Sequence, residues 1–335
     1  MARDMGRTML RPVDSEQGET GVLPVTLLTG FLGAGKTTLL RRVLAEVGPA
    51  RICVVENELG AANIDSEILE NLAPGVVRRV NGCICCAVKG DLVATFRGLA
   101  DLCRERGVER VIVETTGMAE PAEIVPLFGS GGPVGDAFRL ASTVTVCDAM
   151  HVAMDLENSP VAQSQVAVAD LLVVNKADCV DADALARAVS AVRAVNPLAA
   201  VHVGHDGDCP AALVLADAPP TLRFLPVGVG HSHGGVTAHL IEDPGPHDLR
   251  RMRGFLRGLV RTHRDDLLRV KGFVHARQGR RVLVQGVREK LALEPFGRFP
   301  AGGAAPQTAL VTIGIGLDPE TMIEGLRGCR TGGRD

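Results

Sequence analysis

The chain has 335 residues, 46% of them hydrophobic, and its formal net charge at neutral pH is −3. The hydrophobic fraction suffices for two folded domains, and the slightly negative charge with the absence of Trp and Tyr argues against nucleic acid as a partner. The longest apolar runs, such as residues 167–174, are far shorter than a bilayer span, which argues against a membrane partner.

Residues 1–21 are predicted to form a flexible tail, and residues 22–215 alternate β-rich segments with helical ones. Buried strands separated by helices are typical of an α/β fold with a mostly parallel sheet covered on both faces. The predicted strands are residues 25–30, 51–57, 76–80, 110–116, 142–149, 170–176 and 200–204, and helices are predicted at 36–47 and 183–196.

Residues 216–235 are rich in Pro, Gly and His and are predicted to be a linker that carries a short histidine motif, His231-Ser232-His233. From residue 236 to 330 several strands follow one helix closely, which predicts a smaller α+β domain with an antiparallel sheet. The arginines of its first helix are interpreted as a solvated basic face. The predicted strands are 237–243, 269–276, 280–287 and 309–315, and the helices are 248–263 and 319–329.

A phosphate-binding loop is predicted between the first strand and the first helix. The segment reads Gly30-x4-Gly35-Lys36-Thr37, in which backbone amides can wrap phosphates, lysine can reach the β- and γ-phosphates and threonine can hold Mg²⁺. The nucleotide-binding residues predicted here are Gly33, Ala34, Gly35, Lys36, Thr37 and Thr38.

Two later motifs select the base and sense the phosphates. Asn175-Lys176-Ala177-Asp178 ends a strand, and its carboxylate can accept from N1–H and the exocyclic amine of guanine, which argues against an ATP-dependent kinase. Glu114 can support Mg²⁺ through water, and the Gly117 amide can sense the γ-phosphate. The predicted catalytic residues are therefore Lys36, Thr37, Glu114 and Gly117. Because no obvious catalytic glutamine follows Gly117, we expect slow intrinsic hydrolysis of GTP to GDP.

These motifs together resemble the CobW-type GTPases, relatives of UreG and HypB. The resemblance implies a P-loop GTPase domain, a CobW-type C-terminal domain and delivery of Zn, Co or Ni to a client metalloprotein, with a homodimer left open. Two departures are Ala61-Ala62, where relatives often carry a second acidic residue, and the short histidine motif. The matching segments are residues 29–40, 56–60, 81–86, 114–121, 147–151, 163–178, 267–272 and 282–287.

The cysteine cluster Cys83-x-Cys85-Cys86 has four interpretations: a disulfide, a buried structural turn, a redox sensor or a metal site. A disulfide between adjacent cysteines strains the peptide, and we expect a cytoplasmic protein, in which thiols stay reduced. Three thiols beside a glycine favour a metal, with tetrahedral Zn²⁺ as the default and Co²⁺ or Ni²⁺ as alternatives. Glu56 and His151 are the candidates to complete the site.

The sequence thus predicts a Mg²⁺-dependent GTPase that couples its nucleotide state to the transfer of a metal. The alternative is a regulatory GTPase whose cysteine motif is a redox sensor.

Overall fold

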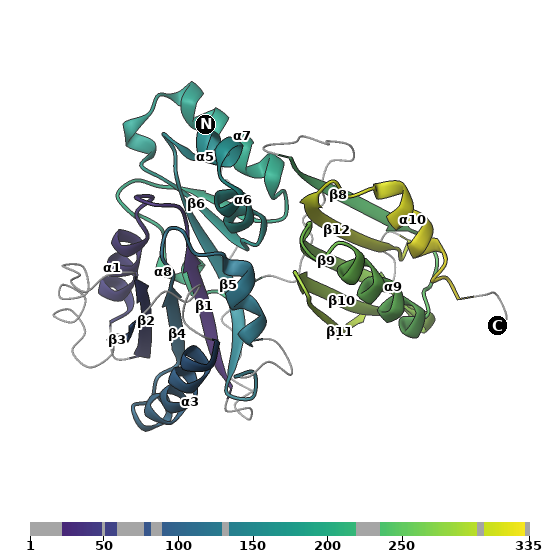
Figure 1. Cartoon of the computed structure of the whole chain (residues 1–335), viewed down its shortest axis with the longest axis horizontal. Coiled ribbons are helices and arrows are strands. Elements are labelled where there is room, and N and C mark those ends of the chain that lie inside the picture. Colours follow the sequence, from purple (N-terminus) through teal and green to yellow (C-terminus); the bar gives the residue numbers. More distant parts are fainter. Residues whose placement is uncertain are drawn as a thin grey trace, which may run out of the picture.

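The computed structural model describes residues 22–48, 51–58, 77–81, 89–128, 134–218, 235–299 and 305–331, without the side chains of 56–58, 77–81, 89–95 and 122–123. Within these residues the chain forms two lobes that lie side by side, each built on one sheet (Figure 1). The tail, the histidine motif and the three clustered cysteines lie outside the described residues. None of the described helices is long and apolar enough to cross a membrane.

The first sheet is entirely parallel in the described part of the chain, in the order β3-β2-β4-β1-β5-β6-β7. This confirms the predicted α/β class. Strand β5 begins four residues earlier than expected, because its first residues pair with β1 although exposed Arg139 interrupts the apolar run. The strands are β1 (Leu23–Thr29), β2 (Ile52–Glu58), β3 (Val77–Asn81), β4 (Arg110–Glu114), β5 (Phe138–Asp148), β6 (Leu171–Asn175) and β7 (Ala200–Val203).

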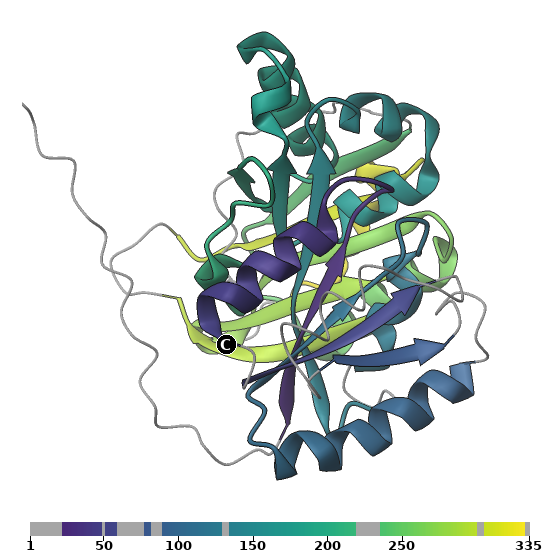
Figure 2. The same cartoon turned by 90° about the vertical axis from the view of Figure 1, so that its left-hand side faces the viewer.

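Helices cover both faces of this sheet, as a buried parallel sheet requires. Helices α1 and α8 pack on one face, and the other helices pack on the opposite face; Figure 2 shows α1 in front of the sheet, with the C-terminal lobe behind. The elements are α1 (Lys36–Val47), α3 (Lys89–Glu105), α4 (Pro121–Ile124), η2 (Val125–Phe128), α5 (Val152–Asn158), α6 (Pro160–Ala167), η3 (Ala177–Cys179), α7 (Ala182–Val195) and α8 (Ala211–Val214).

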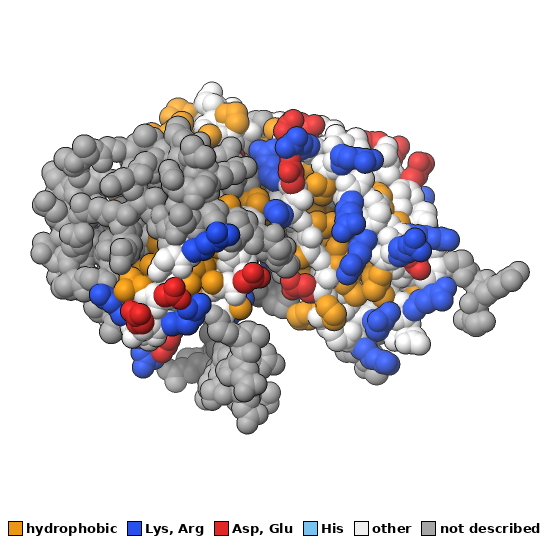
Figure 3. Space-filling model, turned by 60° about the horizontal axis from the view of Figure 1, so that its bottom comes forward, with side chains coloured by type: hydrophobic (Ala, Val, Ile, Leu, Met, Phe, Trp, Pro, Cys, Tyr) orange, Lys and Arg blue, Asp and Glu red, His pale blue; other side chains and the backbone are white. Residues whose placement is uncertain are grey.

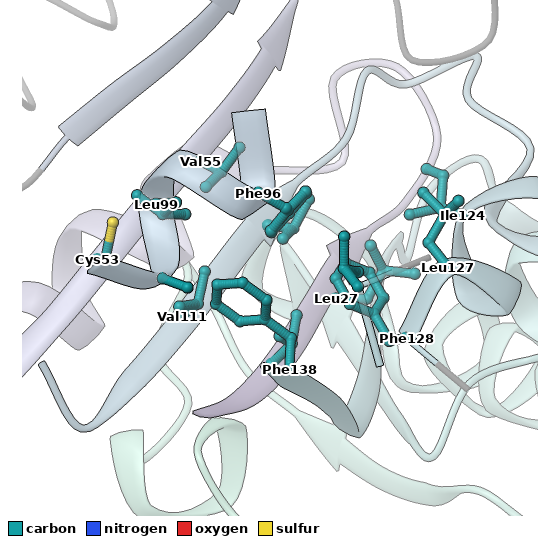
Figure 4. Close-up of a cluster of buried hydrophobic side chains, with 14 of the residues drawn as sticks. Leu27, Cys53, Val55, Phe96, Leu99, Val111, Ile124, Leu127, Phe128 and Phe138 are labelled. Atoms are coloured by element: carbon teal, nitrogen blue, oxygen red, sulfur yellow. The ribbon is translucent and has the colours of Figure 1, made fainter. Parts of the chain in front are cut away.

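The core beneath α3 is built around three phenylalanines (Figure 4). Phe96 of α3 meets Phe128 and Phe138 edge to face, with ring centroids 5.1 and 5.2 Å apart. Aromatic pairs in this geometry add to the stabilisation from buried area alone. This packing holds α3 and η2 against the strands that end at the nucleotide motifs.

The second sheet is antiparallel in the described residues, in the order β11-β10-β9-β12-β8, with two helices on one face. This confirms the predicted α+β domain. The edge strand β11 was not predicted, because its charged residues, Pro295 and Gly297 are typical of a loop. The elements are β8 (Val236–Asp243), α9 (Leu249–Thr262), β9 (Leu267–His275), η4 (Arg277–Gly279), β10 (Arg280–Val287), β11 (Lys290–Arg298), β12 (Thr308–Ile315) and α10 (Pro319–Arg327).

A buried charge cluster joins the two lobes. Asp170, just before β6, pairs with Arg269 and with Lys271 at 3.3 Å, and Arg269 also donates to the carbonyl oxygens of Val168 and Ala169. Burial favours a neutral Asp170, but Arg269 and Lys271 outweigh it and hold the pKa of that carboxyl below its ordinary value. Loss of either the carboxylate or the cations would leave a buried charge without its partner, so the contact between the lobes depends on both.

Candidate functional site

The phosphate-binding loop has the backbone that its sequence predicts. Gly30, Gly33 and Gly35 have φ values of +143°, +73° and +104°, which L side chains rarely adopt. A Cβ on Gly30 would lie 2.2 Å from the Val146 carbonyl oxygen, so any side chain at that position would clash with the backbone of β5. Gly35 precedes α1, and no side chain caps the helix, so its first-turn amides remain available to phosphate oxygens.

Lys36 and Thr37 stand at the start of α1, where the loop ends. Lys36 Nζ donates to the carbonyl oxygens of Gly30 and Phe31 at 2.8 and 3.2 Å, which keeps the ammonium over the loop. The Thr37 hydroxyl donates to Glu114 Oε1 at 2.8 Å. Buried Glu114 ends β4 and is paired in register with Leu28 of β1. A hydroxyl and a carboxylate held together in this way suit the preference of Mg²⁺ for oxygen ligands.

Gly117 lies directly against the phosphate-binding loop. A Cβ on Gly117 would come within 2.8 Å of the Leu32 backbone, so no other residue fits without displacing the loop. Gln165 of α6 fixes this turn, because its side-chain amide donates to the carbonyl oxygens of Gly117 and Ala119 at 3.2 and 3.1 Å. No role was predicted for Gln165, although it lies in a segment that matches the family.

The base motif is tied to the phosphate-binding loop through Asn175. Its amide nitrogen donates to the Ala34 carbonyl oxygen at 2.9 Å, and its amide oxygen accepts from the Gly207 backbone at 2.8 Å. Lys176 adopts a left-handed φ of 59°, and exposed Asp178 follows in η3. Asn175 thus joins three loops, and the Asp178 side chain is exposed beside them.

His151 lies on the base side of the sheet. Its Nδ1 lies 3.1 Å from Asp148 Oδ2, and the same carboxylate accepts from Lys176 Nζ at 2.7 Å. Although burial alone would raise the pKa of Asp148, hydrogen bonds from Lys176, the Met150 amide and His151 hold it below its ordinary value. Asp148 is a positioning group for the base motif, and the sequence reasoning missed it.

Glu56 lies on the opposite side, in β2. Its backbone is paired in register with Arg79 of β3 and with Glu114 of β4, and β3 ends at Asn81, two residues before Cys83. His151 follows β5, three strands away from β2 and therefore about 14 Å distant across the sheet at ~4.8 Å per strand. Among the described side chains, no group of three or more His, Cys, Asp or Glu residues could hold a metal ion.

Both halves of the chain resemble known families. Residues 24–203 match the CobW/HypB/UreG nucleotide-binding domain, and residues 236–330 match the cobalamin synthesis protein cobW C-terminal domain. The zinc chaperone YjiA of Escherichia coli is 30% identical over 92% of this chain and 99% of its own. The zinc chaperone CobW of Pseudomonas aeruginosa is 32% identical, with 91% of each chain covered.

Two solved structures of the E. coli protein share this fold. The Zn(II)-bound YjiA GTPase superposes with a TM-score of 0.72 at 26% identity, covering 92% of this chain and 99% of that one. A second Zn(II)-bound structure, in which one glutamate and two adjacent cysteines are replaced by alanine, gives a TM-score of 0.70 at 25% identity over the same shares.

Proposed function

Because the chain belongs to the CobW/HypB/UreG family, we propose that it is a GTP-hydrolysing zinc chaperone that passes its metal to a client metalloprotein. The observation that carries this proposal is the place of β2 in the sheet. Glu56 of β2 is paired on one side with Glu114, which touches Thr37, and on the other with β3, which leads to the cysteines. One strand thus links the nucleotide residues to the cysteine motif.

In the nucleotide half, the loop amides and Lys36 hold the phosphates of GTP. Thr37 and Glu114 would hold Mg²⁺, and the ion would neutralise the charge that develops on the phosphates. The amide of Gly117 senses the γ-phosphate from a turn that Gln165 fixes. Because Gln165 already donates to two carbonyl oxygens and no glutamine follows Gly117 before α4, the intrinsic hydrolysis rate is expected to be slow.

Guanine is selected by Asp178. A carboxylate accepts from both N1–H and the exocyclic amine of guanine, whereas adenine offers no such pair of donors. Replacing the carboxylate by an amide supplies a donor that suits the 2-carbonyl group of xanthine. Asp178→Asn should therefore lower the affinity for GDP by about 100-fold and raise that for XDP. An unchanged preference for GDP would overturn the assignment of this motif.

In the metal half, Cys83, Cys85 and Cys86 supply thiolates and Glu56 completes the site in preference to His151. Strand β2 lies next to the strand that precedes the cysteines, whereas His151 lies about 14 Å across the sheet. The altered E. coli protein, which still carries Zn(II), has its changes at a matching spacing. Its glutamate and first altered cysteine are 29 residues apart, as are Glu56 and Cys85.

Zinc titrations into the nucleotide-free, GDP-bound and GTP-analogue-bound protein test the coupling. Linkage requires that the nucleotide change zinc affinity by the same factor that zinc changes nucleotide affinity, and equal zinc affinities in all three forms would exclude it. Titrations with Co²⁺ and Ni²⁺ compare the affinity of the protein for the other two candidate metals with its affinity for zinc.

Four variants assign the ligands. Cys85→Ala and Glu56→Ala should weaken zinc binding with GDP binding intact, whereas His151→Ala should leave zinc binding unchanged. If zinc does not bind and peroxide oxidises the cluster reversibly, the redox-sensor alternative holds. Cys179→Ala is the matched control, because Cys179 is exposed and lies outside the motif.

The proposal places this activity in the cytoplasm, where the cysteines stay reduced. A client metalloprotein is the expected partner. Light scattering with and without zinc and nucleotide tests for a homodimer.

A further inference from the structure

The charge of the chain is unevenly divided between its two domains. Residues 236–331 contain sixteen Lys and Arg and ten Asp and Glu, so this part carries a net charge of +6 in a chain whose net charge is −3. The remainder is correspondingly acidic. A basic domain attached to an acidic one indicates that the two domains meet different partners.

Much of this positive charge stands in one row on α9. Arg253, Arg257 and Arg261 are four residues apart, so they share one side of the helix, and Arg264 follows just beyond its last residue, Thr262. Of these four arginines, Arg264 alone forms an ion pair among the described residues, with Glu289. Helix α9 itself contains no Asp or Glu. Like charges at this spacing lower the stability of a helix. The row therefore does not serve folding, which suggests a role in binding.

Two hollows lie beside this arginine row, between α9 and the strands β10 and β11, and together they are called the groove. The lining of the larger, of about 410 Å³, includes Arg257, Arg261, Arg264 and the acidic Glu289, and the lining of the smaller, of about 110 Å³, includes Arg253 and Arg280. The apolar part of the lining is formed by Leu249, Val260, Val282, Leu291, Leu293 and Pro295. Figure 3 shows hydrophobic side chains between Lys and Arg side chains on this domain.

We propose that this groove binds an acidic amphipathic helix of a partner protein. The helical part of the arginine row, from Arg253 to Arg261, spans about 12 Å at ~1.5 Å per residue, and a helix with glutamates four residues apart presents carboxylates at a matching interval. The leucines beside the row suit the apolar side chains of the same helix. A nucleic-acid backbone or a lipid headgroup would meet the arginines but gain little from the groove floor, so a polypeptide fits both features. The inference requires neither GTP nor zinc at the other domain.

A designed peptide tests this proposal on the full chain. The probe is a fluorescent 20-residue helix with a row of glutamates beside a row of leucines, and a twin peptide carries glutamine in place of each glutamate. We expect binding that raises the fluorescence anisotropy, weakens as salt increases and is at least tenfold weaker for the glutamine twin, since charge complementarity supplies much of the attraction.

Variants then locate the site. Arg253→Glu, Arg257→Glu and Arg261→Glu combined should weaken binding at least about tenfold, because three attractions become repulsions. The matched control combines Arg97→Glu, Arg187→Glu and Arg193→Glu, three exposed arginines of the first domain, and makes the same change in net charge. It should change the affinity less than twofold.

Three outcomes would overturn the proposal. Equal weakening by both triple variants would show that only net charge matters. Tighter binding of duplex DNA or anionic vesicles than of the peptide, lost in the same α9 variant, would assign the groove to another class of partner. Equal affinity for the glutamine twin would remove the role of the arginine row.

Discussion

The Thr37 hydroxyl and the Glu114 carboxylate are joined by a 2.8 Å hydrogen bond between the start of α1 and the end of β4. The two residues are 77 positions apart, and the parallel pairing of β1 with β4 brings them together. The bond holds two side-chain oxygen atoms at the place where the phosphate-binding loop ends. Under the proposed function these are the atoms that would help to hold Mg²⁺.

Glu114→Gln should selectively weaken Mg²⁺-dependent nucleotide binding. The amide keeps the shape and can still accept from Thr37, but it removes the charge that Mg²⁺ requires. We expect the gain in GDP affinity on adding Mg²⁺ to fall about tenfold, with affinity in EDTA unchanged, as measured by fluorescent-nucleotide titration. Exposed Glu109→Gln is the control, and an equal loss in EDTA would show damage to the loop instead.

Asp170→Asn should destabilise the junction between the lobes. It leaves the charges of Arg269 and Lys271 buried without their carboxylate, a kind of loss that typically costs about 3 kcal/mol or more of unfolding free energy. Denaturant unfolding, followed separately in each domain, measures the change. Asp206→Asn is the matched control, because Asp206 also pairs with an arginine, at 2.6 Å, but is 70% exposed, and should cost under about 1 kcal/mol.

Local sequence patterns predicted the elements more closely than the contacts between them. The bounds of α1 and β10 agree with the predicted 36–47 and 280–287, because their periodicity and flanking glycines define them. Strand β11 was not predicted, because its sequence contains Pro295 and Gly297 and it is extended only through its pairing with β10.

For the site, the sequence indicated the chemistry of each motif, but it did not indicate which motifs lie in contact in the folded protein. That Asn175 bonds to the phosphate-binding loop is a consequence of strand order, whereas His151 meets Asp148 through a local contact three residues along the chain. Strand order depends on packing over the whole sheet, which a short motif does not encode. The ligand set of the cysteine motif stays a prediction.

Thiol labelling should separate the cysteine motif from the other six cysteines. Only Cys179 is exposed among those six, and burial raises the pKa of Cys147 and Cys209 to about 12, so neither forms thiolate near neutral pH. A variant with Cys83, Cys85 and Cys86 replaced by serine should therefore retain one fast-reacting thiol. The further change Cys179→Ser should abolish the fast phase, and a fast phase that persisted would contradict the buried positions of the others.

The C-terminal domain should lose stability as the pH falls below about 6.5, because His247 is fully buried. Burial lowers the pKa of His247 despite its neighbour Asp243 at 3.3 Å, so the unfolded chain takes up a proton before the folded chain does. The free energy of unfolding should then fall by up to about 1.4 kcal/mol per pH unit from the unfolded pKa down to the folded one. Asp243 acts in a separate, more acidic range, because hydrogen bonds from Arg330 outweigh its burial and hold its pKa below the ordinary 3.8. Denaturant unfolding between pH 5 and 8 measures the slope. His247→Gln should flatten it, and an unchanged slope in that variant would assign the pH dependence to another group.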